Sequence, residues 1–158
     1  MKILHILDHS IPLHSGYTFR TKAILEQQQK LGWETFHVTS PKHCVATDPV
    51  EQIQGFTFYR SEKPKGLFAG MPFLNQWSIV QSLVKRLDEI IPEIKPDILH
   101  AHSPALNGLA ALKAARKHNI PLVYECRAFW DDAAVDHGTA TEGGLRYHLT
   151  KKAGNLRF

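Results

Sequence analysis

The sequence lacks both glycine motifs that most often mark a nucleotide phosphate site. Neither G-x-G-x-x-G nor G-x-x-x-x-G-K-[ST] occurs in its 158 residues. A dinucleotide-binding fingerprint and a P-loop are therefore both absent, which argues against a dehydrogenase-type dinucleotide domain.

Cysteine and long apolar runs are also scarce. Cys44 and Cys126 are the only cysteines, and they are isolated from each other, so we expect reduced thiols in a cytoplasmic protein. No apolar run reaches the length that spans a bilayer. The N-terminal apolar run stops at Asp8 without a small-residue cleavage site, so a secretory signal is not expected.

Arginine-rich runs and base-stacking motifs are missing too, so we expect no nucleic-acid partner. The formal charge of +4 permits attraction to other anions, such as phosphorylated ligands or phospholipid. The loop at residues 63–68 mixes lysines with apolar residues. It is either a peripheral contact with the inner face of a membrane or an ordinary surface loop.

The hydrophobic patterns that are present alternate between strand and helix periods. They predict an α/β fold: a Rossmann-like, doubly wound, mostly parallel sheet. Predicted strands cover residues 3–7, 33–39, 56–59, 97–102 and 121–126, and predicted helices cover 18–31, 75–91 and 105–118. A fourth helix is expected from Leu145, and residues 40–54 and 62–73 are expected to be loops.

Several residues predict where the helices begin and end. Gly32 is placed to stop the first helix, and Pro92 and Pro96 to stop the second. Pro104 suits the first position of the third helix. In the first helix the spacing assigns four residues to the buried side, namely Ile24, Leu25, Gln28 and Leu31.

Polar residues collect where three predicted strands end, and ligands of open parallel sheets bind beyond the carboxyl ends of the strands. We therefore expect residues 8–16, 102–104 and 125–127 to converge on one crevice. Gly16 and Arg20 suit an anion at a helix N-terminus; the ordinary alternatives are a turn glycine and a solvated arginine. His9 flanks the same loop as a ligand contact or a surface residue.

His102 is the strongest single polar candidate. His100 lies two residues before it, so both side chains point to one face of the strand. Glu125 and Arg127 also share a face, either as a structural ion pair or as ligands for sugar hydroxyls and phosphate. His5 is expected to be a core histidine. No metal-ligand spacing involves Asp131, Asp132 or His137, so we expect no metal.

Longer segments resemble a known family. The cues are MKILHILD followed by a Pro/Gly loop, KLGWETFHVTS, and PDILHAHSPALNGLAALKAARKHNIPLVYE. Together they are similar to the N-terminal half of retaining GT-B glycosyltransferases of family four. DHSIPLHSGYTFRT, TSPKH and YECRAFWDDAAVDHGT resemble the branch associated with exosortase and exopolysaccharide loci.

The resemblance implies transfer of a sugar from a nucleotide-sugar donor to a saccharide or lipid-linked acceptor, without another cofactor. It assigns Ser15, Gly16 and Tyr17 to the donor diphosphate and the acceptor side, and His102 to the reacting centre. Arg127 stands where many members carry a histidine. A guanidinium is not a base at neutral pH, so it would stabilise phosphate or oxyanion charge. The remaining binding candidates are Arg20, His9, Glu125 and Asp131.

The resemblance covers residues 1–158 as one acceptor-side domain. The donor-binding C-terminal domain of the family does not occur in this sequence, so we expect a piece of a longer protein that is inactive alone and needs that domain as its partner. The alternative is a non-catalytic Rossmann-like domain that binds a small molecule or regulates.

Overall fold

The computed structural model describes residues 1–43, 45–46, 48–64 and 72–127. They form one six-stranded sheet in the order β3-β4-β2-β1-β5-β6, in which every pairing is parallel except that of β3 with β4. The strands are β1 (Lys2–Leu7), β2 (Glu34–Thr39), β3 (Val50–Ile53), β4 (Phe56–Arg60), β5 (Ile98–His102) and β6 (Leu122–Glu125). The helices are α1 (Gly16–Lys30), α2 (Pro72–Ile94) and α3 (Ala105–His118). The predicted α/β fold is confirmed.

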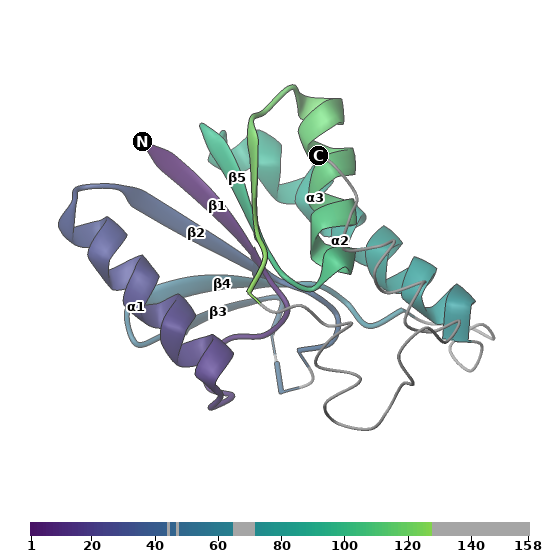
Figure 1. The fold of residues 1–158 in the computed structure, drawn as a ribbon, viewed down its shortest axis with the longest axis horizontal. Helices are drawn as coiled ribbons and strands as arrows, with labels where there is room; N and C mark the ends of the chain where they lie inside the picture. The colour runs from purple at the N-terminus through teal and green to yellow at the C-terminus, as the bar shows by residue number, and fades with distance from the viewer. Residues whose placement is uncertain (44, 47, 65–71, 128–158) are drawn as a thin grey trace.

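Helices cover both faces of the sheet, with α1 on one side and α2 and α3 on the other (Figure 1). The face under α2 and α3 is aliphatic, because alternate residues of β1 and β5 point there. Leu4 and Leu99 are fully buried on that face against Leu83 and Leu87 of α2. This layer is the main hydrophobic core, and it leaves the other face free for polar groups.

The face under α1 carries a row of histidines. His5, His37 and His102 are fully buried there and His100 is half-buried. Ring centroids lie 5.9 Å apart for His5 and His37, and 5.2 Å apart for His5 and His102. The expectation that His5 is a core histidine is confirmed. Its ring neighbours include the imidazoles of His37, His100 and His102.

The sequence pattern did not predict β3, which lies inside the segment 40–54 that was expected to be a loop. Its four residues pair antiparallel with β4 through a two-residue turn at Gln54 and Gly55. Both turn residues have positive φ, 53° and 82°, as a type I′ hairpin requires. A four-residue edge strand with two polar residues gives too short an alternation to detect.

Both ends of α2 and the role of Pro104 also differ from the expectations. Pro92 does not close α2, which begins at Pro72 rather than Asn75 and continues through Pro92 to Ile94. A proline near the helix end costs one backbone hydrogen bond while its φ remains helical. Pro104 is the N-cap of α3 rather than its first helical residue.

The end of α1 is as predicted, and so is the burial of Leu25, but the rest of the predicted buried side is not fully buried. Gly32 has φ 78°, and the N–H groups of Gly32 and Trp33 donate to the carbonyls of Gln29 and Gln28, which is a Schellman motif. Leu31 is 67% exposed. The buried residues of the helix are Thr18, Thr21 and Leu25, because α1 rests on the polar face of the sheet.

No helix within the described ranges combines the length and the apolar character needed to cross a membrane.

Candidate functional site

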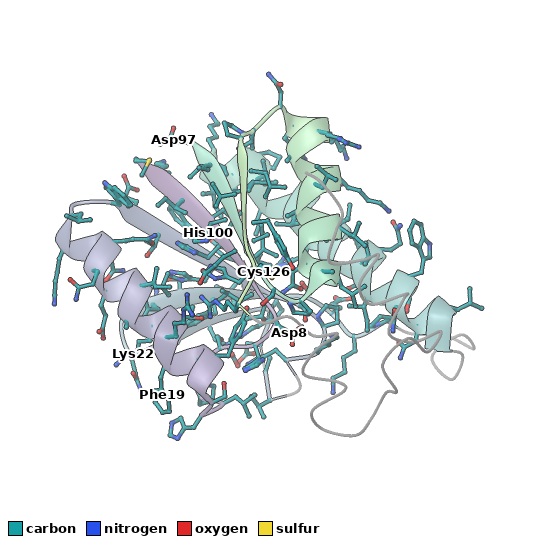
Figure 2. All side chains as sticks on the ribbon, viewed as in Figure 1. Asp8, Phe19, Lys22, Asp97, His100 and Cys126 are labelled. Atoms are coloured by element: carbon teal, nitrogen blue, oxygen red, sulfur yellow. The ribbon has the colours of Figure 1, made fainter. Side chains whose placement is uncertain are left out.

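The three strand ends converge as expected, because β1, β5 and β6 are neighbouring parallel strands. The N–H of Ser103 donates to the carbonyl of Glu125 at 2.9 Å. The N–H of Asp8 donates to the Tyr17 hydroxyl at 3.1 Å. Figure 2 shows Asp8 and Cys126 at this edge of the sheet, with Asp97 at the opposite edge. A single site therefore includes the start of α1 and the ends of three strands.

Glu125 is the anionic centre of the site. Its Oε1 accepts from Arg20 Nη2 at 2.9 Å and lies 3.2 Å from Arg127 Nε, while its Oε2 lies 2.8 Å from His102 Nδ1 and 3.4 Å from His100 Nε2. The hydrogen bond with His102 and the nearby Arg127 guanidinium lower the pKa of Glu125 to about 2. Glu125 is thus a carboxylate at neutral pH. The predicted pairing of Glu125 with Arg127 is present.

Arg127 joins the end of β6 to α1. Its Nη1 donates to the Tyr17 carbonyl at 3.1 Å and to Thr21 Oγ1 at 2.7 Å, and its guanidinium carbon lies 4.4 Å from the centre of the Tyr17 ring. The side chain is only 6% exposed. These contacts describe a positioning residue that fixes Tyr17 and Glu125. Direct stabilisation of a leaving phosphate by Arg127 stays a prediction.

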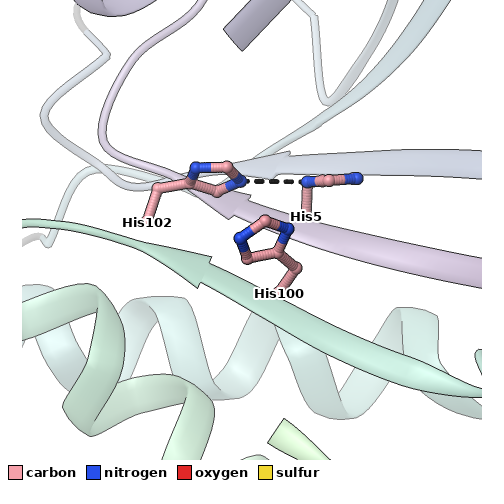
Figure 3. A group of neighbouring side chains, drawn as sticks. All are labelled: His5, His100 and His102. Atoms are coloured by element: carbon pink, nitrogen blue, oxygen red, sulfur yellow. Dashed lines mark hydrogen bonds between the residues drawn. The ribbon is translucent and has the colours of Figure 1, made fainter. Parts of the chain in front are cut away.

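His102 begins a chain of hydrogen bonds that runs under α1. Figure 3 shows its Nε2 facing Nδ1 of His5, at 2.9 Å, with His100 beside them. His5 Nε2 lies 2.8 Å from the amide oxygen of Gln28. Burial lowers the pKa of His102 to about 4 and that of His5 well below its usual value, so both rings are neutral at pH 7.

Because both rings are neutral, each carries one proton, and the position of the proton on His102 sets the donors and acceptors along the chain of hydrogen bonds. His102 Nδ1 lies near both Glu125 Oε2 and Arg127 Nη2. A carboxylate only accepts and a guanidinium only donates, so Nδ1 serves one of them at a time. With Arg127 as donor, His102 Nε2–H donates to His5 and His5 Nε2–H donates to Gln28. With Glu125 as acceptor, the proton of His102 sits on Nδ1 instead.

The start of α1 lies beside this network. Ser15 is the N-cap, and its Oγ accepts from the Thr18 N–H at 3.1 Å. His9 Nε2 lies 2.8 Å from the same oxygen, so His9 orients the cap. Gly16 is the first residue of the helix, and a Cβ built there would meet no described heavy atom within 4 Å. Neither space nor positive φ therefore demands a glycine at this position.

The structure brings together all but one of the predicted site residues. Arg20 joins through Glu125, although its side chain is 59% exposed. Asp131 lies outside the described residues, as do Asp132, His137 and the helix expected from Leu145. The sequence analysis missed Thr21 as the partner of Arg127 and gave Gln28 no polar role. The sequence feature that could have indicated both residues is that they are polar and lie on the side of the helix that faces the sheet.

The histidines also bear on the expectation of no metal. One nitrogen from each of His5, His100 and His102 lies within 4.8 Å of the others. However, both ring nitrogens of His5 and of His102 already have protein partners. A metal ion would have to displace at least one of these hydrogen bonds, and the absence of a metal stays a prediction.

A family model described as "Glycosyl transferase 4-like domain" matches residues 15–155. The chain belongs to this family. The match begins at Ser15, the cap of α1, and covers every strand end of the site except that of β1. A search among curated proteins gives no match.

Solved structures agree with this glycosyl transferase 4-like fold. Sucrose-phosphate synthase from Thermosynechococcus elongatus is 14% identical with a TM-score of 0.64, over 96% of this chain and 39% of that one. The calicheamicin glycosyltransferase CalG4 is 13% identical with a TM-score of 0.52, over 96% of this chain and 42% of that one. The C-terminal domain of PF1911 hydrogenase from Pyrococcus furiosus is 13% identical with a TM-score of 0.54, over 78% and 90% of the two chains.

At these identities the likeness concerns the fold alone. The chain spans about two fifths of the length of the two larger proteins. The match to the family confirms the predicted glycosyltransferase resemblance at family level. The match does not test the resemblance to the branch associated with exosortase and exopolysaccharide loci, which stays a prediction.

Proposed function

We propose that this chain is the acceptor-side domain of a retaining glycosyltransferase. The whole protein would move a hexosyl group from a nucleotide sugar to a glycan or lipid-linked acceptor, without a metal. The chain alone would be inactive, because most donor contacts would come from a second domain. Exopolysaccharide synthesis at the cytoplasmic face of a membrane is the role favoured by the resemblance of residues 8–21 and 124–139.

The observation that carries the proposal is the position of Gly16 at the N-terminus of α1. This glycine opens α1 at the carboxyl edge of the sheet, where helix N–H groups attract phosphate. Ser15 takes the N–H groups of Thr18 and Phe19 through its side chain and its carbonyl. No described residue accepts from the N–H groups of Gly16 and Tyr17, which we assign to a ligand. Since no steric contact requires a glycine here, we assign it the role of letting a diphosphate come close to the backbone of the first helical turn.

The neighbouring side chains suit the same chemistry. Arg20 is largely exposed and adds positive charge one turn into α1. Glu125 is held as a carboxylate, which accepts hydrogen bonds from sugar hydroxyls. A neutral His102 at the reacting centre orients groups without adding a charge. The leaving diphosphate would thus be stabilised mainly by backbone and cations.

Substitution of Gly16 by alanine tests the proposal in the full-length protein. The assay supplies a panel of nucleotide sugars with lipid extract and measures release of the nucleoside diphosphate. We expect Gly16→Ala to weaken donor binding about tenfold, or about 1.4 kcal/mol, without lowering Tm, because alanine is a better helix former. The control is Gln27→Ala, at an exposed position of the same helix. Equal kinetics for the two variants would contradict the proposal.

Anomeric configuration supplies a separate test of mechanism. NMR of the product formed with the native protein should show the donor configuration retained. An inverted product would leave the glycosyltransferase assignment in place and overturn the retaining mechanism.

A further inference from the structure

A polar cavity lies at the same edge of the sheet, beyond the ends of β2 and β4. Its volume is about 320 Å³, the small end of the range for ligand sites. We call it the His43 cavity. Its walls are His43, Ala46, Asp48, Pro49, Arg60, Ser61, Glu62 and Lys63.

Two polar groups of this cavity have no hydrogen-bond partner among the residues that the structure describes. They are the His43 ring, with both of its nitrogens, and the Ser61 hydroxyl. His43 is only 5% exposed. Buried polar groups are hydrogen-bonded in the great majority of cases, and leaving one unsatisfied costs about 1–3 kcal/mol. An orphaned, buried imidazole on a cavity wall therefore indicates a ligand.

The backbone around these two side chains is held firmly. The N–H of His43 donates to the Ser40 carbonyl at 3.1 Å, and the N–H of Ser61 donates to the Thr39 carbonyl at 3.2 Å. Arg86 Nη2 donates to the carbonyl of Pro49 at 2.8 Å. The walls are thus positioned by the end of β2 and by α2, independently of any ligand.

The charges of the cavity are balanced. Its lining includes two cationic residues, Lys63 and Arg60, and two anionic residues, Asp48 and Glu62. The Arg60 guanidinium is already engaged, with Nε 2.7 Å from Glu51 Oε2 and Nη1 2.7 Å from Ser10 Oγ. Its charge is therefore compensated by Glu51 and leaves no strong attraction for an anion.

The chemistry of the two orphaned groups identifies the ligand class. Burial, with Arg60 nearby, lowers the pKa of His43 to about 4. A neutral imidazole offers one donor and one acceptor, and a serine hydroxyl offers both as well. An unprotonated phosphate oxygen only accepts and would use only the donors, whereas a sugar hydroxyl both donates and accepts and so matches His43 and Ser61 fully.

We propose that the His43 cavity binds a hydroxyl-bearing saccharide ring, which is one unit of an extended acceptor. The extension follows from the sheet order. Three strand spacings separate β4 from β5, which is about 14 Å, so a ring here lies well away from His102. To call this saccharide an acceptor rests on the proposed function. Its binding to the cavity can nevertheless be measured without any sugar transfer.

NMR titration of the isotope-labelled chain tests the cavity. The probes are the methyl glycosides of glucose, galactose and mannose, N-acetylglucosamine, and inorganic phosphate. We expect saturable shifts of the His43 ring and the Ser61 amide with at least one sugar. His43→Phe should weaken that binding at least about tenfold. His43→Gln, which keeps a donor and an acceptor, should restore part of it.

The control is His118→Phe, at the opposite edge of the sheet, and thermal unfolding checks that each variant folds. If His43→Phe does not fold, Ser61→Ala supplies the same comparison. Shifts with phosphate but with no sugar, or equal sugar affinity in wild type and variants, would overturn the inference. Loss of transfer with cavity binding intact would instead count against the proposed function. In the full-length enzyme, His43→Phe should raise KM for the acceptor while kcat stays within about twofold.

Discussion

At the scale of single residues, His102 Nδ1 has two partners that make opposite demands on it. Glu125 requires a proton on that nitrogen and Arg127 requires none, although both side chains lie within hydrogen-bond distance. The position of one proton therefore depends on which partner prevails. His5 and Gln28 follow, since each step along the chain fixes the next.

Removal of either partner should move that proton in opposite directions. In Arg127→Met, Glu125 remains as acceptor, so we expect His102 to carry its proton on Nδ1. In Glu125→Gln, the amide and Arg127 both donate, so the proton should move to Nε2. Nitrogen-15 NMR of the imidazoles distinguishes the two tautomers, and each variant should lose about 1–3 kcal/mol in urea unfolding. The same tautomer in both variants would show that neither residue controls it.

Residues also mark the limit of what the sequence predicts. Convergence of His102, Glu125 and Arg127 follows from parallel topology alone, so it could be predicted. The partners of Arg127 could not, because Thr21 lies more than a hundred residues away and is typical of many helix positions. No sequence pattern singles out His43, because its significance depends on a cavity formed by two separate segments, residues 43–49 and 60–63.

At the scale of elements, α1 is unusual because it covers a polar face of the sheet. Its buried side consists of two threonines and Leu25, while the aliphatic core lies under α2 and α3. The helical spacing of α1 therefore placed Leu25 correctly on the buried side, but it also chose Leu31, which is exposed, and passed over the two threonines. The start of α1 consequently depends on its cap more than on burial.

Ser15 variants separate the stability of α1 from its proposed attraction for phosphate. Ser15→Ala removes the acceptor of the Thr18 N–H, so the free energy of unfolding should fall by about 1 kcal/mol. Ser15→Asp retains a cap and favours the helix dipole, so stability should be kept. Its negative charge would nevertheless repel a donor diphosphate. Urea unfolding and nucleotide-sugar binding measure the two effects.

Ser15→Asn is the matched control for the aspartate, because it caps the helix without a charge. We expect it to keep both stability and donor binding. If Ser15→Asp binds the nucleotide sugar as well as Ser15→Asn does, the start of α1 does not contact the diphosphate.

At the scale of the whole molecule, the row of buried histidines makes folding sensitive to acid. Burial lowers the pKa of His37 and His102 to about 4, and also lowers the pKa of His5 and His100. In the unfolded chain these groups titrate near 6.5. The unfolded state therefore binds more protons than the native state in the window between these values, so stability must fall as pH falls through it.

Stability should accordingly be greatest above about pH 6.5 and decline from there toward about pH 4. Glu125 adds a second loss at lower pH, between its ordinary value of 4.5 and about 2, because its carboxylate is favoured only in the folded state. Urea unfolding at a series of pH values measures the slope. His37→Gln should reduce that slope by up to about 1.4 kcal/mol per pH unit, because one buried imidazole no longer titrates on unfolding. His14→Gln, at an exposed position, is the matched control for the loss of an imidazole. A stability curve that is flat between pH 4 and 6.5 would mean that the histidine face opens to water before the chain unfolds.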